Sequence, residues 1–299
     1  LTIKKNTYLN YMQHIVKHFE PYFQGYNLED ITVMDIEKYY SYKIEEGLSV
    51  STIKKHRSTL SAAFSYALSH EMINKNPIPI AVMPKQTKYE AEILSFNEIR
   101  DLIQIASKDT ISLPVLLASL LGLRASEALG LRWDRIDFTN HTITINHTYL
   151  KCWDIRRKKT VYWFSDTTKN KASKRVLPMP VFLEKALKIH KLVQMNSHPK
   201  NRKYKDYVCT QQNGNMINHN ILSKHMNNLI KEMNINKHIT FHGLRHSFAT
   251  YLYKDFHVSI KDIQVFLGHS DISTTGNIYT HIEINPEISQ LVNNRIEMR

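Results

Sequence analysis

A stretch rich in proline and lysine divides this sequence into two parts of different character. Residues 76–92 hold three prolines: Pro77, Pro79 and Pro84. The stretch ends just before a new helix signal, in which Ser95 and Glu98 have the spacing of a capping box. We therefore expect a helical domain over 1–84, a linker over 85–93 and a second domain over 94–299. The chain length of 299 residues also suits two domains better than one.

The first part has the periodicity of helices. Apolar residues recur at intervals of three and four, as in Tyr8, Tyr11, Ile15 and Phe19 and again in Ile53, Leu60, Phe64 and Leu68. Three or four helices would fit this pattern.

Ser49 or Ser51 can cap the helix that contains the second group of apolar residues. Its exposed face is expected to carry a basic run: Lys54, Lys55, His56 and Arg57. Such a run suits contact with phosphates, although an ordinary solvated surface explains it equally well.

The second part alternates between helices and strands. The apolar segment ISLPVLLASLL predicts a helix that ends at Gly122, and TITINHTYL, TVYWF and KRVLPMP predict strands of one small antiparallel sheet. Helical patterns return from Phe182 to the end of the chain. The expected fold is therefore mainly α with a small antiparallel β-sheet, an α+β class.

The net charge of the chain and its few cysteines indicate which kind of partner and which cellular compartment to expect. The chain has 40 Lys and Arg against 27 Asp and Glu, a formal net charge of +13, which favours a polyanionic partner. The two cysteines, Cys152 and Cys209, lack metal-ligand spacing and suit a reducing, cytoplasmic environment. No segment has the apolar length of a membrane span. Because the chain starts at Leu1 rather than Met, we expect a fragment or processed form that lacks a further N-terminal domain.

Two short segments carry cationic side chains at helical spacing. Arg124, in GLRASE, lies shortly after a glycine that is expected to end one helix. Arg124 itself is expected to stand at the start of the next helix, where a side chain can project into a cleft. His242 and Arg245, three residues apart, share a helix face. His242 and His246 also have the spacing of a zinc-protease helix, but Gly243 replaces the glutamate base and Arg245 would repel a dication.

A third segment, FLGHSDISTTGNIYTHI, places His269 ten residues before Tyr279. In this order and spacing, the three segments resemble the conserved boxes of the tyrosine recombinases, the family of phage and conjugative-transposon integrases and Xer resolvases. The resemblance covers the whole second part and implies an enzyme that breaks and rejoins DNA for recombination, integration or transposition through a 3′-phosphotyrosine. The catalytic residues that it implies are Arg124, Lys169, His242, Arg245, His269 and the nucleophile Tyr279, with Glu127 as a supporting carboxylate.

Lys169 is assigned from its place nine residues before Pro178, which resembles the KTxxSxRxxPL spacing of the conjugative-element branch of the family; Lys171 and Lys174 are neighbouring alternatives. The chemistry accounts for the residue types. Two guanidiniums can offset the charge that grows on a phosphodiester under attack, and a tyrosine with a pKa near 10 needs a base or a cationic field. We expect His242 on the base side, Lys169 on the acid side, and neither a metal nor a cofactor.

The resemblance also implies a partner and an assembly. The first part corresponds to a core-DNA-binding domain that closes with the second part around double-stranded DNA, and residues 151–164 are expected to form a hairpin against DNA or a decorated surface loop. The expected DNA contacts are Lys54, Lys55, Arg57, Arg156, Arg157, Lys158 and Lys171. The apolar stripe after Tyr279 is expected to dock on a neighbouring protomer in a homotetramer on two DNA sites, with packing onto its own domain as the alternative.

Excisionase or host DNA-bending proteins would be accessory partners of such an integrase. The rival functions are a Xer-like chromosome or plasmid resolvase, a type IB topoisomerase, and a DNA-binding protein that has kept the fold without the reaction. The complete set of catalytic positions argues against the last of these.

Overall fold

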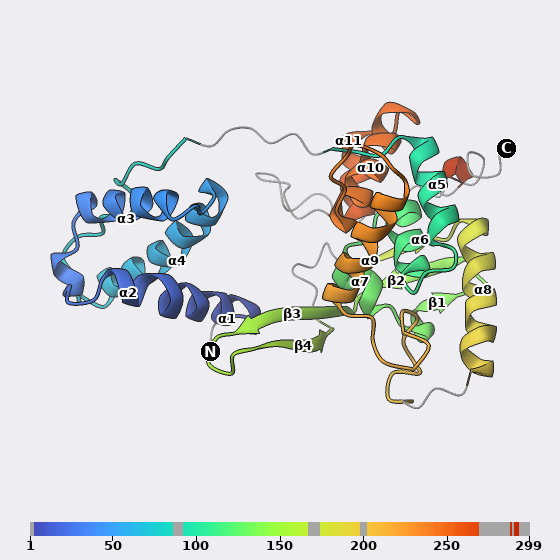
Figure 1. The fold of residues 1–299 in the computed structure, drawn as a ribbon, viewed down its shortest axis with the longest axis horizontal. Coiled ribbons are helices and arrows are strands. Elements are labelled where there is room, and N and C mark those ends of the chain that lie inside the picture. Colours follow the sequence, from blue (N-terminus) through green and yellow to red (C-terminus); the bar gives the residue numbers. More distant parts are fainter. Residues whose placement is uncertain are drawn as a thin grey trace. The chain divides into compact units, whose positions relative to one another are not determined.

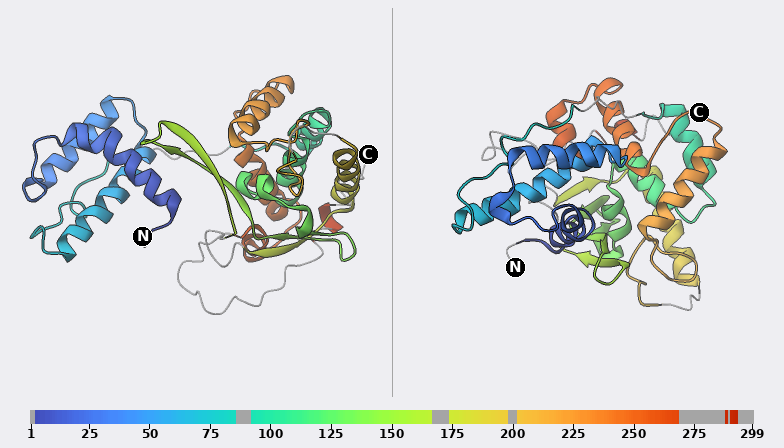
Figure 2. Two further views of the ribbon diagram at one scale, coloured as in Figure 1. Left: turned by 90° about the horizontal axis from the view of Figure 1, so that it is seen from below. Right: turned by 60° about the vertical axis from the view of Figure 1, so that its left-hand side comes forward.

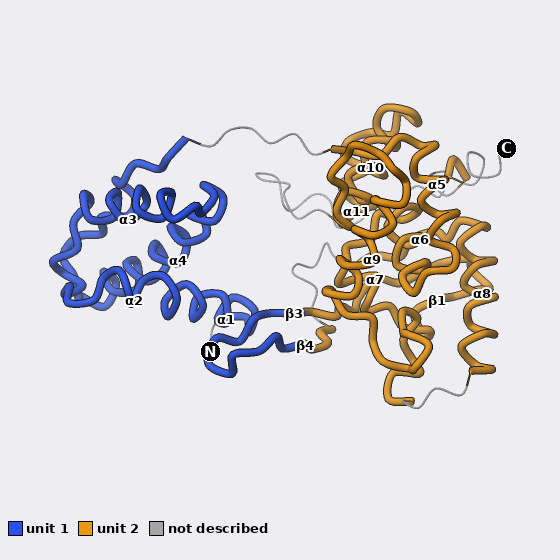
Figure 3. The backbone as a smooth tube through the Cα atoms, in the orientation of Figure 1, with its two compact units in different colours: residues 1–90, 151–161 blue, residues 91–150, 162–299 orange. Residues whose placement is uncertain are grey.

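The computed structural model describes residues 3–85, 92–166, 174–197, 202–268, 288 and 290–292. It contains 55% helix and 11% strand, so the mainly α class with small antiparallel sheets is confirmed. The chain forms two compact units (Figure 3): unit 1 comprises residues 1–90 and 151–161, and unit 2 comprises residues 91–150 and 162–299. No described helix combines the length and the apolar character needed to cross a membrane.

Unit 1 is built from helices. In chain order they are α1 (Lys5–His14), the π-helical turn η1 (Ile15–Phe19), α2 (Glu20–Tyr22), the 3₁₀ turn η2 (Leu28–Asp30), α3 (Val33–Glu45) and α4 (Val50–Ser69). Thr32 and Asp35 form a capping box at the start of α3, and the Ser49 side chain accepts the Thr52 N–H at the start of α4. Ser49 is therefore the N-cap of α4. Both α1 and α3 pack against α4 (Figure 1).

The basic run on α4 does not share one exposed face, which corrects the expectation above. His56 is 1% exposed and lies in contact with the core that Ile53 and Leu60 help to form. Arg57 is half-buried and donates to the carbonyls of Ile78 and Pro79, both at 3.2 Å. Since an α-helix turns about 100° per residue, four consecutive positions cannot all face solvent. The lysines of the run, Lys54 and Lys55, are exposed.

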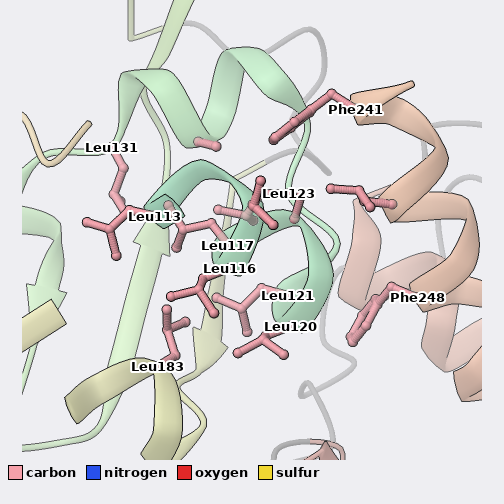
Figure 4. Packing of buried hydrophobic residues seen from close by; sticks show 14 of the residues in the cluster. Leu113, Leu116, Leu117, Leu120, Leu121, Leu123, Leu131, Leu183, Phe241 and Phe248 are labelled. Atoms are coloured by element: carbon pink, nitrogen blue, oxygen red, sulfur yellow. The ribbon is translucent and has the colours of Figure 1, made fainter. Parts of the chain in front are cut away.

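Unit 2 is organised around one apolar helix. Its helices are α5 (Phe96–Ala106), α6 (Ser112–Leu121), α7 (Ala125–Gly130), α8 (Val181–Asn196), α9 (His219–Glu232), α10 (Phe241–Lys254) and α11 (Ile260–Leu267), with a 3₁₀ turn η3 (Trp133–Arg135). Every residue of α6 from Leu113 to Leu121 is buried. Figure 4 shows Leu116 and Leu120 of α6 between Leu183 of α8 and Phe248 of α10. A helix that is apolar on all sides needs such a cover on every side.

The strands form two sheets rather than the single expected sheet. Strands β1 (Ile136–Asp137), β2 (Thr142–Ile145) and β5 (Arg175–Pro178) pair antiparallel in the order β1-β2-β5, and β3 (Thr148–Asp154) pairs with β4 (Lys159–Ser165). The segment TITINHTYL is therefore broken between β2 and β3, at Asn146 and His147. The buried His147 ring lies 2.6 Å from Asp166 and 3.3 Å from the Tyr207 hydroxyl. In the left view of Figure 2 the three-stranded sheet lies along the lower side of unit 2.

The tip of the β3–β4 hairpin belongs to unit 1, where it contacts α1. The Arg156 guanidinium lies 5.9 Å from the centre of the Tyr8 ring and 3.9 Å from the Met12 sulfur, and the Cys152 thiol contacts Asn10 at 3.4 Å. These contacts involve one of the arginines that the sequence offered for DNA.

The described tail residues pack onto their own unit. Ile288 is 1% exposed and Val292 is 7% exposed, and both join the hydrophobic core of unit 2. In this single chain these two members of the apolar stripe therefore pack within their own unit, and docking of the tail on a neighbour stays a prediction.

Protonation of His56 should destabilise unit 1 at acid pH. Burial, followed by the charges of His14, His18 and Lys43, lowers the pKa of His56 from 6.5 to about 3. The unfolded chain therefore binds a proton at this ring at a higher pH than the folded chain does. The contribution of the neutral His56 ring to the free energy of unfolding is complete above pH 6.5. It should be lost as pH falls toward 3, by about 1.4 kcal/mol per pH unit.

Denaturant unfolding of the full chain between pH 7 and pH 4.5 tests this expectation. His56→Gln should show a weaker pH dependence than the unmodified protein, whereas His70→Gln, at an exposed position in the same helical unit, should not. An unchanged pH dependence in His56→Gln would show that the ring is not the group responsible.

Gly122 should tolerate no side chain. It ends α6 with φ +61°, and an added Cβ would overlap the Leu267 side chain and lie 2.8 Å from Phe248. Left-handed backbone and overpacking together should make Gly122→Ala cost about 2 to 5 kcal/mol in chemical unfolding. Gly47→Ala is the control: it has φ +86° with open space around the added carbon, so it should cost clearly less. Equal losses would mean that packing at Gly122 is not tight.

Candidate active site

The first functional side chain stands at the start of α7. Arg124 is the N-cap residue of this helix; its backbone N–H donates to Glu127 Oε2 at 3.1 Å and its Nη1 donates to Oε1 at 2.8 Å. The Arg124 side chain keeps 32% of its surface exposed, whereas that of Glu127 keeps 3%. Glu127 thus holds a cation that can still reach solvent or a ligand.

A second arginine, which the sequence analysis missed, holds the same carboxylate. Arg175 opens β5, and its Nη2 and Nη1 lie 2.9 and 3.3 Å from the two Glu127 oxygens. Its Nε donates to the Phe266 carbonyl at 2.8 Å. Two signals could have revealed it: Arg175 occupies the arginine position of the KTxxSxRxxPL pattern, and it shares the inward-facing parity of β5 with the fully buried Leu177.

The electrostatics of Glu127 follow from these contacts. Burial alone would raise the pKa of this carboxyl, but the Arg175 guanidinium, then the Arg124 guanidinium and backbone N–H, lower it to about 2. Glu127 is therefore ionised throughout the physiological pH range.

A third arginine is held by the ends of two helices. Arg245 of α10 donates to the carbonyls of Gly122 and Leu267, both at 2.7 Å, and Arg124 Nη2 donates to the Gly268 carbonyl at 2.9 Å. These carbonyls belong to the C-terminal ends of α6 and α11, where the helix dipole favours cations.

Arg245 is 2% exposed, and burial, followed by the nearby Arg124, lowers its pKa to about 9. It remains mostly cationic at neutral pH. Three guanidiniums (Arg124, Arg175 and Arg245) thus surround one carboxylate (Glu127), and the excess positive charge suits an anionic ligand.

His242 lies close to the same cations. Its ring is exposed and stands edge-on to that of His246, with the centroids 4.6 Å apart. Partial burial, followed by His246, Arg245 and Arg124, lowers the pKa of His242 below 6.5. A mostly neutral imidazole at pH 7 can accept a proton. Among the described residues, no three His, Cys, Asp or Glu side chains form a group that could hold a metal ion.

The structure brings together four of the predicted site residues: Arg124, Glu127, His242 and Arg245. Lys169, Lys171, His269 and Tyr279 lie outside the described residues. The expected DNA contacts Lys54, Lys55, Arg57, Arg156, Arg157 and Lys158 all belong to unit 1 and are not part of this cluster. The last described residues of the α11 segment, Leu267 and Gly268, stand directly before His269 in the chain, and their carbonyls accept hydrogen bonds from Arg245 and Arg124.

Comparison with known proteins places both parts of the chain. Residues 92–285 match the model of the phage integrase family, and residues 1–44 match the N-terminal SAM-like domain of phage integrases. A tyrosine recombinase XerC-like protein of Caldanaerobacter subterraneus subsp. tengcongensis is 32% identical over 300 residues, which cover 93% of this chain and 75% of that relative.

Two solved structures share the fold. The Tn1549 transposon integrase in complex with circular intermediate DNA has a TM-score of 0.75 at 22% identity, with 97% of this chain and 94% of that chain covered. The lambda integrase tetramer bound to a Holliday junction has a TM-score of 0.62 at 22% identity, with 94% and 75% covered. The family match spans most of the chain and includes the whole arginine cluster, so this protein belongs to the phage integrase family, the tyrosine recombinases.

Proposed function

We propose that this protein is a site-specific integrase of a mobile genetic element, which cleaves and rejoins double-stranded DNA through a 3′-phosphotyrosine at Tyr279. Its membership of the tyrosine recombinases gives the reaction class, DNA breaking and rejoining. The observation that carries the proposal is the cluster of Arg124, Arg175 and Arg245 around Glu127, which binds carbonyls at the end of α11, directly before His269 in the chain.

The proposed chemistry assigns one task to each residue. Arg124 and Arg245 bind the non-bridging oxygens of the scissile phosphate and offset the charge of the pentacoordinate transition state. The Tyr279 oxygen attacks phosphorus, the bond to the 5′-oxygen breaks, and Lys169 gives that oxygen a proton. His242 acts on the base side, with His269 as a hydrogen-bonding partner. The 5′-hydroxyl of another strand later attacks the phosphotyrosine, which restores a phosphodiester without ATP. The scheme uses no cofactor.

DNA is the proposed macromolecular partner of both units. The net charge of +13 favours binding to the phosphate backbone, and the exposed lysines on α4 and the exposed basic tip of the β3–β4 hairpin offer contacts from unit 1. We assign 1–84 to a core-binding domain, 85–93 to a linker and 94–299 to the catalytic domain. The hairpin tip 151–161 would serve unit 1, with which it clusters.

A homotetramer on two DNA sites, joined by exchanged C-terminal tails, is the proposed active assembly, as the tetrameric state of lambda integrase on a Holliday junction suggests. Because Ile288 and Val292 are buried within their own unit in the single chain, exchange would require these residues to leave that core. Excisionase or host DNA-bending proteins remain proposed accessory partners. The buried thiols of Cys152 and Cys209 and a DNA substrate favour a cytoplasmic location.

A Xer-like resolvase is the second candidate, because the XerC-like relative reaches 32% identity over most of this chain. We favour the mobile-element function because the transposase of transposon Tn916 is also a relative, 27% identical over 281 residues that cover 89% of this chain. Mapping the covalently attached ends on the DNA of a candidate element would separate the two, since a resolvase should attach to a chromosomal or plasmid dimer site instead.

Tyr279→Phe should abolish the covalent adduct on a nicked suicide substrate, because in the proposed scheme the Tyr279 hydroxyl oxygen is the atom that bonds to phosphorus. Binding to a single site should change little, since one hydroxyl adds little to a large electrostatic interface. Denaturing gels measure the adduct, and Tyr253→Phe, a change at an exposed tyrosine of α10, serves as the control that should cleave normally. An adduct that persists in Tyr279→Phe would move the nucleophile to another residue.

Lys169→Ala should cleave ordinary DNA about 10² to 10⁴ times more slowly, the usual contribution of a general acid. It should regain most of its rate when sulfur replaces the bridging 5′-oxygen, because a thiolate leaves without a proton. Arg124→Ala should gain nothing from sulfur, since its guanidinium acts on the non-bridging oxygens. Rescue of Lys171→Ala in place of Lys169→Ala would identify Lys171 as the acid, and rescue of neither would remove lysine from this role.

A further inference from the structure

We propose that Arg175 is a positioning residue of the cleavage site: it fixes the Glu127 carboxylate and the last turn of α11, and through both it holds Arg124 in place to bind the scissile phosphate. The inference rests on the proposed function, because it assigns Arg175 a part in DNA cleavage. It concerns a residue that would contact neither the DNA nor the reacting atoms.

Arg175 contacts both of the structural elements that hold Arg124. Arg124 is held by Glu127 on one side and by the carbonyls of Leu267 and Gly268 on the other. Arg175 binds both oxygens of Glu127 and, through Nε, the carbonyl of Phe266 in the same helix end. A shift of Arg175 would therefore move both supports of Arg124 together.

The side chains of Arg124 and Arg175 differ in solvent exposure, and this difference indicates different roles. The side chain of Arg175 is 3% exposed, equal to that of its partner Glu127, whereas Arg124 is 32% exposed. A DNA phosphate can contact the exposed part of the Arg124 side chain without rearrangement of the fold. It cannot contact the buried Arg175 side chain in this way. Any effect of Arg175 on cleavage must accordingly pass through Glu127, Arg124 or the end of α11.

The charge of the Glu127 carboxylate also depends on Arg175. A carboxylate buried as deeply as Glu127 is costly unless cations and hydrogen bonds compensate it. When Arg124 turns part of its charge to a phosphate, its hold on Glu127 weakens, and Arg175 is the cation that keeps the carboxylate ionised. Without Arg175, the pKa of Glu127 should rise, because burial raises it and the largest opposing charge is gone. A protonated Glu127 would lose its grip on Arg124.

The test compares suicide-substrate cleavage by the full chain and by Arg175→Met across pH. The variant should cleave about 10 to 100 times more slowly at neutral pH, the range expected when a catalytic group is displaced by a fraction of an ångström to an ångström. Binding to a single site should stay within about twofold. Arg100→Met, at an exposed arginine on α5 of the same unit, is the matched control and should retain wild-type cleavage at every pH.

The pH profile distinguishes positioning from mere packing. A carboxylate with a lowered pKa is charged above that pKa, so titration of Glu127 should cause no loss of rate in the pH range in which the wild-type protein is folded. In Arg175→Met the pKa is raised, and the acid-side loss of rate should begin at a higher pH. Arg175→Lys, which restores the positive charge but not the bidentate contact, should return the profile toward wild type. Glu127→Gln combined with Arg175→Met should remove the extra acid-side loss, because no carboxyl remains to titrate.

Three outcomes would contradict the positioning role of Arg175. Wild-type rates and profile in Arg175→Met would overturn the inference and leave the proposed function intact. A slow Arg175→Met with an unshifted profile, not rescued by lysine, would assign Arg175 to packing alone and also overturn it. If the wild-type protein itself forms no adduct with the DNA of any candidate element, the proposed function fails, and the role of Arg175 in cleavage fails with it.

Discussion

One buried carboxylate, Glu127, is the interaction on which the candidate site depends. It is ionised inside the protein because two guanidiniums and a backbone N–H face it, and it fixes Arg124 at the mouth of the cluster. The cluster holds more positive than negative charge, and carbonyls at helix ends offset part of it by accepting hydrogen bonds from Arg124, Arg175 and Arg245. An anion with two accessible oxygens would complete the balance, which is why a phosphodiester is the ligand that the geometry favours.

The packing of helices in unit 2 positions the carbonyls that bind these arginines. Two helices, α6 and α11, end in left-handed glycines, Gly122 and Gly268, whose carbonyls bind Arg245 and Arg124. The glycine at the end of α6 is also required by space, since Leu267 and Phe248 pack where a Cβ would be. The all-apolar α6 is held between α8 and α10 (Figure 4), so the position of Gly122 is set by core packing. Stability and site geometry therefore depend on the same contacts.

Sequence alone predicted those features that local chemistry decides. The capping box at Ser95, the C-cap at Gly122 and the mainly α class are present in the structure, because caps and glycine conformations depend on near neighbours. The features that depend on distant residues were wrong or missed. His56 points into the core, and the strand pattern breaks at His147, whose partners Asp166 and Tyr207 lie far along the chain. Arg175 was missed because a basic residue on a strand suggests solvent until its buried partner Glu127 is known.

If Arg124 acts by offsetting the charge on the scissile phosphate, its loss should matter far less when that phosphate is neutral. A DNA substrate whose scissile phosphate carries a methyl group in place of one non-bridging oxygen has no charge for a guanidinium to offset. The account predicts that Arg124→Ala, which should be nearly inactive on ordinary DNA, forms the covalent adduct on methylphosphonate DNA at a rate much nearer to that of the unmodified protein. If Arg124→Ala remained as defective on the neutral substrate as on the charged one, Arg124 would not act by offsetting phosphate charge, and this account of the site would be wrong.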